Sequence, residues 1–306
     1  MPGFQGKIMA PITEPSHLNN PLATSLQLGT SSSQLDGVLN DMEDSVRYQT
    51  ARLIQVAGIL LRLPQEIVAQ AIVVLQRFWV GPDGGSMLEY DPKDAAAAAL
   101  YLSAKPSGSA VSPRQLLTVF EYLFATKGDF GAAAASIGEL KTEWRLSEGD
   151  YEAHRDRLYK TESYMLRVLG FQTHVALPYT LCVNYLQALE VFQTSEGSMV
   201  AKRAFAHLTS ALLSPQLLYL THQPSALATA SIYLAAREVD VKLPEVEWWE
   251  VFDVDREELG FLVVAFTSLQ GFAIEENRKW GRRKVPLTIE ELRAESERQR
   301  MLETGA

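Results

Sequence analysis

The sequence has little cysteine, few cations and no long apolar run, and each of these shortages excludes a class of protein. Cys182 is the single cysteine among 306 residues, so an intramolecular disulfide framework and a CxxC zinc site are both excluded. No uninterrupted apolar run reaches the roughly 18–20 residues that a bilayer span needs. Prolines at 2, 11 and 15 interrupt the stretch where a secretory leader would be apolar. We therefore expect a soluble, intracellular protein of a reducing compartment, with no membrane partner.

Acidic residues outnumber basic ones, with 37 Asp and Glu against 28 Lys and Arg and a net charge of −9. Binding to phosphate backbones needs a surplus of cations, so we do not expect direct nucleic-acid binding. One local basic cluster lies near the C-terminus and comprises Arg278, Lys279, Arg282, Arg283 and Lys284. Three interpretations of this cluster stay open: a nuclear-import signal, a contact for RNA or a phosphopeptide, and a solvated linker.

The sequence also lacks the common motifs of catalytic and metal sites. Its histidines show no HExxH or HxH spacing, and no GxxxxGK(S/T), GxGxxG or GxSxG motif occurs. The glycines at 81–85 are not followed by Lys and Ser or Thr, which indicates a turn rather than a phosphate loop. Cys182 has apolar neighbours, which is typical of a buried thiol. We expect no catalytic residue, no metal and no cofactor.

From residue 35 onward the apolar residues recur at helical spacing, as in Ile67, Ala71, Val74 and Phe78. Prolines at helix starts and glycines at helix ends divide this pattern into helices that are joined by short connections. Asp91 and Asp255 are candidate N-caps of two of these helices. The predicted helices cover 53–60, 64–80, 92–105, 113–127, 151–169, 178–192, 196–213, 224–238, a short stretch from 244, 255–271, and 288–303 in the tail. No segment shows the alternation of a strand.

Two of the predicted helices resemble each other. Residues 98–105 read AALYLSAK, residues 230–237 read ASIYLAAR, and each segment lies in the third helix of a group of five. Small side chains let neighbouring helices approach closely, so both helices are expected at the centre of a bundle. The sequence therefore predicts an all-α chain with an irregular arm at 1–35, five-helix blocks at 36–172 and 173–272, and a charged, partly helical tail at 273–306.

Several segments resemble the cyclin family, and within it the cyclin L branch of transcriptional cyclins. They are RLIQVAGILLRLPQ at 52–65, QRF at 76–78, YTLCVNYLQALE at 179–190, SIYLAAR at 231–237, and the pairs Leu243-Pro244 and Trp248-Trp249. Cyclins K, T, C and H share the fold and part of these motifs. The resemblance implies two tandem five-helix cyclin boxes in a nuclear regulatory subunit that is not an enzyme. Such a subunit binds and activates a cyclin-dependent kinase in RNA polymerase II transcription or pre-mRNA splicing.

The resemblance also implies which residues contact the kinase. The family pairs a Lys on the third helix with a Glu on the fifth, and Lys105 and Glu162 match this signature. Leu166 and Phe171 match apolar residues that cyclins present to the kinase. A solvated helix-end pair and a core position for Leu166 are the alternatives. The family usually has two acidic residues shortly after the Lys, whereas this sequence continues Pro106-Ser107-Gly108.

Two other functions stay open at this point. Scaffolds similar to transcription factor IIB also use tandem cyclin repeats, but they carry a zinc ribbon and basic repeats, which one cysteine and a net charge of −9 oppose. A degenerate cyclin that serves only as an interaction module is favoured by the Pro106-Ser107-Gly108 departure. Cyclin L proteins often carry an arginine–serine-rich tail, and this sequence has none.

Overall fold

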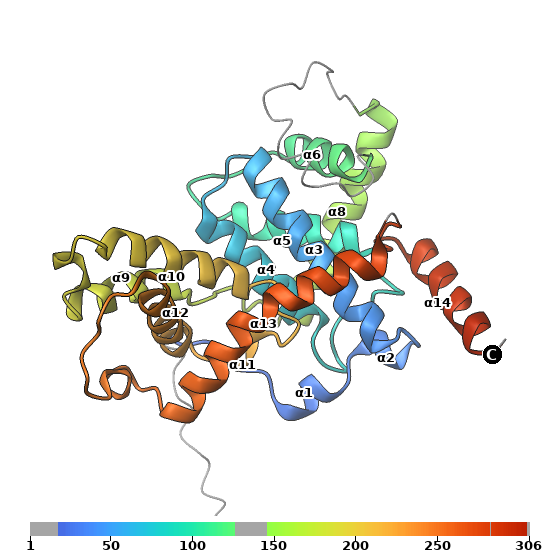
Figure 1. Ribbon diagram of the computed structural model, residues 1–306. Coiled ribbons are helices and arrows are strands. Elements are labelled where there is room, and N and C mark those ends of the chain that lie inside the picture. Colours follow the sequence, from blue (N-terminus) through green and yellow to red (C-terminus); the bar gives the residue numbers. More distant parts are fainter. Residues whose placement is uncertain (1–17, 126–145, 282, 305–306) are drawn as a thin grey trace, which may run out of the picture.

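The computed structural model describes residues 18–125, 146–281 and 283–304, which form helices and connecting turns without a strand (Figure 1). The all-α prediction is therefore confirmed for this part of the chain. Most of the loose stretch expected at 128–150 lies outside the described residues. The helices gather into two bundles, the second of which ends in the long helix α13 (Arg256–Trp280), and a final helix projects from the molecule (Figure 1).

The first bundle is built around α5, which packs against four other helices. Its helices are α3 (Asn40–Leu60), α4 (Gln65–Trp79), α5 (Pro92–Ala104), α6 (Pro113–Ala125) and α8 (Glu148–Val168). The alanines of α5 at 95, 96, 98 and 99 have no exposed surface. Because an alanine side chain extends little beyond the backbone, neighbouring helices can pack close to α5, as its central position requires.

The second bundle repeats this arrangement around α12, which packs against α9, α10 and α13. Its elements are α9 (Pro178–Ala188), η2 (Val191–Gln193), α10 (Gly197–Ala211), α11 (Leu218–Thr221), α12 (Pro224–Val239), η3 (Trp248–Phe252) and α13 (Arg256–Trp280). Both alanine-rich helices thus lie at the centre of a bundle, as the sequence repeat predicts. The helix predicted at 178–192 ends early because Glu190 adopts a left-handed backbone, with φ of 56°.

The N-terminal arm holds the two bundles together through Asn20, which is only 6% exposed. The Asn20 amide exchanges two hydrogen bonds of 2.8 Å with the backbone of Ala176, and its oxygen also accepts one from Arg77 at 3.0 Å. The Gln223 side-chain amide accepts from the Asn20 backbone N–H at 3.0 Å and donates to the Asn20 carbonyl at 3.1 Å. Within residues 18–35, the part of the arm that the structure describes, the helices are the short α1 (Ser25–Gly29) and α2 (Ser32–Leu35), in agreement with the prediction of no long helix there.

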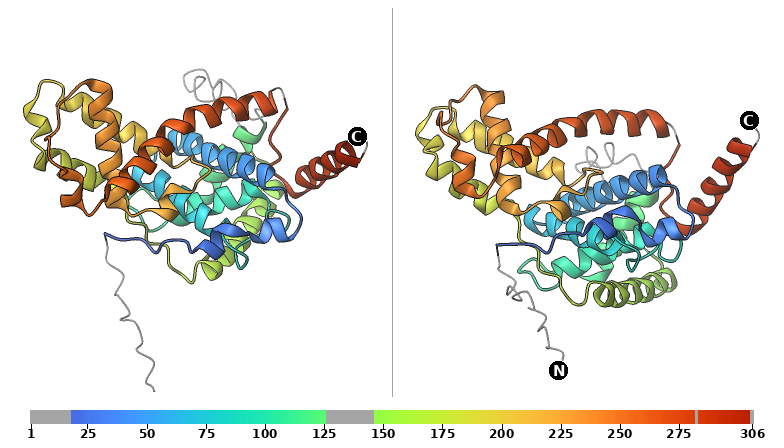
Figure 2. Two further views of the ribbon diagram at one scale, coloured as in Figure 1. Left: turned by 60° about the horizontal axis from the view of Figure 1, so that its bottom comes forward. Right: turned by 90° about the horizontal axis from the view of Figure 1, so that it is seen from below.

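The predicted end of α13 near residue 271 is wrong. The helix begins at the predicted cap, where the Asp255 side chain accepts from the Glu258 amide, but it continues to Trp280 along α3 of the first bundle (Figure 2). Phe272 packs edge-on against Tyr48 at 5.3 Å, and the Trp280 side chain is buried. These contacts stabilise the last turns of α13 because they bury apolar surface that a shorter helix would leave in water.

The tail helix α14 (Ile289–Thr304) forms as predicted, and its start is anchored on the first bundle. Asp91 was expected to cap α5, but its side chain makes no bond to that helix. The Asp91 carboxylate accepts instead from the Ile289 amide at 2.7 Å, and the Thr288 hydroxyl accepts from the Glu291 amide at 3.3 Å, so both satisfy amides at the start of α14. The amide of Lys93 donates to the Leu287 carbonyl at 3.1 Å. Leu287 and Leu292 are buried at this junction, which fixes the connection between α13 and α14.

Candidate functional site

All four residues that the family resemblance assigns to partner contact line one surface hollow of about 360 Å³. The hollow lies between the end of α5 and the last turns of α8. Its lining consists of Lys105, Glu162, Leu166 and Phe171 together with Tyr159, Ser163 and Arg167. The structure therefore brings together residues that are up to 66 positions apart in the sequence.

Lys105 and Glu162 form an ion pair with 3.1 Å between Nζ and Oε1. The Lys105 side chain is 57% exposed, whereas that of Glu162 is only 8% exposed. The hydrogen bond that Lys105 donates to the Glu162 carboxylate raises the pKa of the ammonium above its usual range, so Lys105 is charged at neutral pH. An ammonium has three protons and this carboxylate takes one, which leaves donors directed toward solvent or toward a partner's carbonyl oxygens.

The C-terminal end of α8 forces Phe171 outward. The Gly170 amide donates to the Arg167 carbonyl and the Phe171 amide to the Leu166 carbonyl, which is the bonding pattern of a Schellman motif. Gly170 and Phe171 both have a left-handed backbone, with φ of 56° and 62°. This conformation is unfavourable for a residue with a Cβ. The Phe171 ring is 70% exposed despite being large and apolar, so the fold holds an aromatic side chain in water beside the ion pair.

The remaining lining residues add an apolar and aromatic surface. Leu166 is half-buried and reaches the hollow, so a full core position is not what the structure shows. Tyr159 is 41% exposed, and its ring lies 6.2 Å from that of Tyr101. Sequence reasoning missed Tyr159, although its spacing of three residues before Glu162 places both on one helix face and could have revealed it.

The turn after α5 explains how the chain accommodates the departure at Pro106-Ser107-Gly108. The Ser107 hydroxyl donates to the Ala104 carbonyl at 2.7 Å and accepts from the Ser109 amide at 3.1 Å. These bonds satisfy backbone groups at the helix end, where acidic residues would leave them to water. Lys105 is the C-cap residue directly after the last residue of α5, and its ion pair with Glu162 forms despite the departure.

The second bundle has no equivalent ion pair at the matching position. Arg237, which corresponds to Lys105 in the sequence repeat, lies over the Tyr233 ring at 5.8 Å and donates weakly to its hydroxyl at 3.5 Å. The neighbouring Glu238 pairs with Arg203 at 2.6 Å and contacts His207 at 3.0 Å. The two repeats thus share a central helix but differ in the chemistry at its end.

The predicted basic cluster is largely engaged within the fold. Lys279 donates to the Asp41 carbonyl at 2.8 Å and to the Ser45 hydroxyl at 2.9 Å, while Arg283 pairs with Glu295 at 3.1 Å. Lys284 lies over the Phe124 ring, and Arg278 is exposed on α13. Arg282 lies outside the described residues. Lys279 and Arg283 thus contact the rest of the fold, whereas Arg278 and Lys284 are exposed, so the segment is partly docked and partly solvated.

Residues 18–125, 146–281 and 283–304 contain no group of three or more His, Cys, Asp or Glu side chains that could hold a metal. Cys182 is fully buried, and burial raises the pKa of its thiol to about 12. Within the same described part, α13 is the one helix long and apolar enough to cross a membrane by length and composition. Its Leu259, Leu262 and Phe266 are buried, and the helix packs on α12, so these residues serve the core.

Comparison with known proteins points to one family by sequence. No family model matches. The chain is 30% identical to cyclin-L1 of Danio rerio over 79% of its length, and 28% identical to human cyclin-L2 over 89%. It is also 30% identical to cyclin-L1-1 of Arabidopsis thaliana over 75%. The matched regions cover 45%, 47% and 51% of those proteins, so the chain spans about half the length of the curated relatives it matches.

Comparison with solved structures supports the fold. A chain in the crystal structure of the yeast RNA Pol II CTD kinase CTDK-1 complex superposes with a TM-score of 0.64. That match has 12% identity and covers 92% of this chain and 84% of the other. A chain of the CAK complex of Chaetomium thermophilum, solved with ATP-gamma-S, superposes with a TM-score of 0.52 at 16% identity. This second match covers 84% of this chain and 77% of the other.

Proposed function

Because this chain is a cyclin L-like member of the cyclin family, we propose that it is a regulatory subunit that binds and activates a cyclin-dependent serine/threonine kinase. In such a pair the kinase carries out the chemistry, and this chain supplies no catalytic residue. The activated kinase acts in RNA polymerase II transcription or pre-mRNA splicing, and the pair is nuclear. The names of the relatives and the kinase complexes among the fold neighbours support this proposal.

The observation that carries the proposal is the hollow at the end of α5 and α8. It combines a charged donor at Lys105, a nearly buried acceptor at Glu162 and an exposed ring at Phe171. A fixed donor and acceptor can pair with the main chain of a partner, and each neutralises the other, which limits the desolvation cost of an interface. The exposed ring supplies the apolar anchor that dominates most protein interfaces.

Activation follows if this surface fits the active conformation of the kinase better than the inactive one. A partner shifts a conformational equilibrium only by the difference between its affinities for the two states. For protein kinases the active state requires the Lys–Glu pair of the catalytic domain to be in place, which depends on the position of its αC helix. Contacts from Lys105 and Glu162 to the segment before that helix provide the differential binding.

The first test is affinity purification of the full chain from its native cells, followed by identification of the bound kinase and a binding assay with it. Lys105→Ala combined with Glu162→Ala should weaken the complex by about thirtyfold or more, as expected for hot-spot residues. The matched control is Arg237→Ala, which removes the cation at the equivalent place of the second bundle. An unchanged affinity in the double variant would refute the assignment of this surface.

A charge swap separates binding from folding. Lys105→Glu with Glu162→Lys keeps an ion pair between α5 and α8 but reverses the donor and acceptor that a partner meets. We expect this variant to fold and to lose kinase binding. If the complex forms but kinase activity does not rise, the chain is an interaction module, the alternative that the Pro106-Ser107-Gly108 departure keeps open. Tight binding to duplex DNA at about 0.15 M salt would favour the scaffold similar to transcription factor IIB instead.

A further inference from the structure

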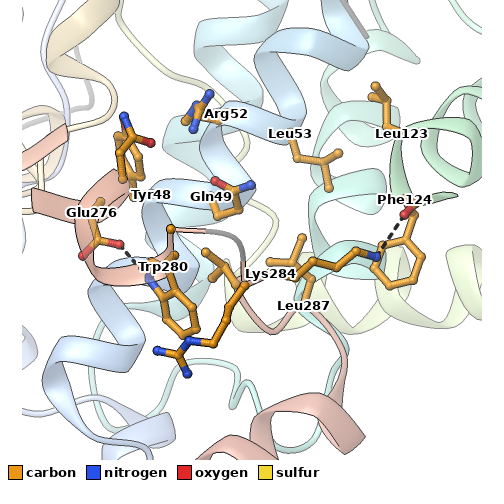
Figure 3. A pocket seen from close by; sticks show the side chains of 14 residues that line it. Tyr48, Gln49, Arg52, Leu53, Leu123, Phe124, Glu276, Trp280, Lys284 and Leu287 are labelled. Carbon is orange, nitrogen blue, oxygen red and sulfur yellow. Dashed lines mark hydrogen bonds between the residues drawn. The ribbon is translucent and has the colours of Figure 1, made fainter. Parts of the chain in front are cut away.

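A second cavity, of about 120 Å³, lies where the C-terminal tail docks on α3 and α6 (Figure 3). It is on the junction between the first bundle and the tail, and none of the residues that line the hollow at Lys105 lines it. Aromatic side chains from three elements form much of its wall, namely Tyr48, Phe124 and Trp280. Its volume accommodates one side chain or small ion rather than a larger ligand, since drug-sized sites are commonly about 300–1,000 Å³.

An unpartnered amide faces this cavity. Gln49 on α3 is 8% exposed, and its side chain makes no hydrogen bond to any residue that the structure describes. Figure 3 shows its amide between Trp280 and Arg52, in the middle of the lining side chains. Its amide atoms are not among the fully buried polar atoms without a partner, so they keep accessible surface in the cavity. A ligand that enters the cavity can therefore reach the Gln49 amide and hydrogen-bond to it.

The charges around the amide are mainly positive. Arg52, Arg283 and Lys284 line the cavity, against Glu276 as the one carboxylate among the lining residues. Glu276 already accepts a bond from the Trp280 indole at 3.1 Å and lies 3.7 Å from the Lys279 ammonium. The lining thus carries a net positive charge in a chain whose overall charge is −9. Electrostatic attraction of this kind selects anions.

Lys284 is held only weakly by the fold and can turn toward a ligand. Its ammonium lies 3.5 Å from the Phe124 carbonyl, beyond the usual range of a hydrogen bond, and 5.0 Å from the centre of that ring. Its stem crosses the base of the cavity (Figure 3). The Arg52 guanidinium lies on the opposite wall, 5.6 Å from the centre of the Tyr48 ring. Two cations and an amide on different walls match the several acceptor oxygens of a phosphate better than the two of a carboxylate.

We propose that this cavity binds a phosphorylated serine or threonine side chain of a partner peptide, held by Arg52, Lys284 and the Gln49 amide. The small volume admits the phosphorylated side chain and leaves the peptide backbone outside, where the exposed face of the tail is available. The proposal goes beyond kinase activation, and its test needs no kinase. The site exists only while the chain around the end of α13 is docked on the first bundle, because Trp280 is the last residue of α13 and Lys284 follows it.

The test measures fluorescence anisotropy of a short Gly/Ala peptide with one central phosphoserine, using the full chain. The wild type should bind the phosphopeptide, and it should bind the unphosphorylated peptide at least about tenfold more weakly. Arg52→Gln and Lys284→Gln should each weaken phosphopeptide binding by about tenfold. Arg293→Gln is the matched control, because it removes the same charge from an exposed position of α14; its affinity should stay within about twofold of wild type.

Gln49→Leu distinguishes a ligand-binding amide from a structural one. The leucine fills a similar volume and removes an amide that no described residue hydrogen-bonds, so the urea midpoint of the free protein should change little while phosphopeptide affinity falls about tenfold. A fall in the midpoint with unchanged affinity would overturn the role of Gln49. Equal binding of both peptides, or equal weakening by Arg293→Gln, would overturn the site itself.

Two competitors identify the source of the phosphate. Inorganic phosphate should displace the peptide only at much higher concentration, because it lacks the contacts of the peptide backbone. If it competes as effectively as the phosphopeptide, the cavity binds free phosphate and the proposed peptide partner is wrong. A single-stranded RNA oligonucleotide that competes equally well would likewise overturn the proposal, since it would show general attraction of polyanions.

Discussion

Replacing Phe171 by glycine should stabilise the free protein and weaken its complex with the kinase at the same time. Phe171 is left-handed, with φ of 62°, a conformation that disfavours a residue with a Cβ by roughly 1–2 kcal/mol relative to glycine. Glycine also gives the unfolded chain more freedom, which offsets about 0.4–1 kcal/mol of that relief. Because the ring is 70% exposed, its removal loses little burial. The net effect is a gain of up to about 1.5 kcal/mol in the free energy of unfolding.

The binding effect has the opposite sign. Truncating an aromatic anchor at a protein interface typically weakens a complex by about 2–4 kcal/mol, or about 30-fold to 1,000-fold in the dissociation constant. Few substitutions raise stability while they abolish a partner contact, so the combination is a specific signature of a strained functional residue.

Urea unfolding of the free chain and titration with the purified kinase measure the two effects. Phe171→Ala is the matched comparison, because it removes the ring but keeps a Cβ in the left-handed conformation. Phe171→Gly should therefore be the more stable of the two, while both bind the kinase equally weakly. Equal stability of the two variants would show that no backbone strain is stored here. Wild-type affinity in both would show that the ring does not contact the kinase.

Three further outcomes are expected. Asn20→Ala should lower the free energy of unfolding by about 2–3 kcal/mol, because it leaves buried groups at the junction unpaired, whereas the exposed Asn184→Ala should change it by less than about 0.5 kcal/mol in the same urea titration. Asp91→Ala removes the acceptor of the Ile289 amide at the start of α14 and should speed hydrogen exchange of that amide with little change in α5. The raised pKa of Cys182 means that the folded protein favours the neutral thiol, so the contribution of this group to the free energy of unfolding is complete below the unfolded pKa near 8.5 and is lost as the pH rises toward about 12. At pH 8 the native protein should therefore react with a thiol reagent only after denaturation. Rapid labelling of the native protein would contradict the burial of Cys182.

The sequence predicted the helices well wherever the deciding contacts are local. Prolines at 92, 113, 178 and 224 each open a helix, because their fixed φ suits a first turn whose amides are unpaired in any case. The predicted end of α13 failed because Phe272 and Lys279 find their partners on α3, more than two hundred residues earlier. Asp91 failed as a cap of α5 for the same reason, since its bond is to Ile289. No local pattern contains such distant pairings.

In the candidate site, too, some features could be predicted from the sequence and others depend on contacts that only the fold creates. Lys105 and Glu162 could be named from the family signature, and the structure places them 3.1 Å apart, but their contact with a kinase stays a prediction. The strain at Phe171 was not predicted, because only Gly170 carries a sequence signal for a left-handed backbone. The cavity beside Gln49 depends on how the tail folds back, and the sequence showed only its basic residues.

The continuous course of α13 has a mechanical consequence for the whole molecule. A helix of 25 residues is about 37 Å long at 1.5 Å per residue, and this one starts in the second bundle and ends against the first. If one bundle rotated relative to the other, α13 would have to bend, or Trp280 would have to leave its buried position. Either change would expose apolar side chains that are now buried, which is unfavourable. The chain therefore binds a partner as one rigid body, so little conformational entropy is lost in aligning the two bundles during association.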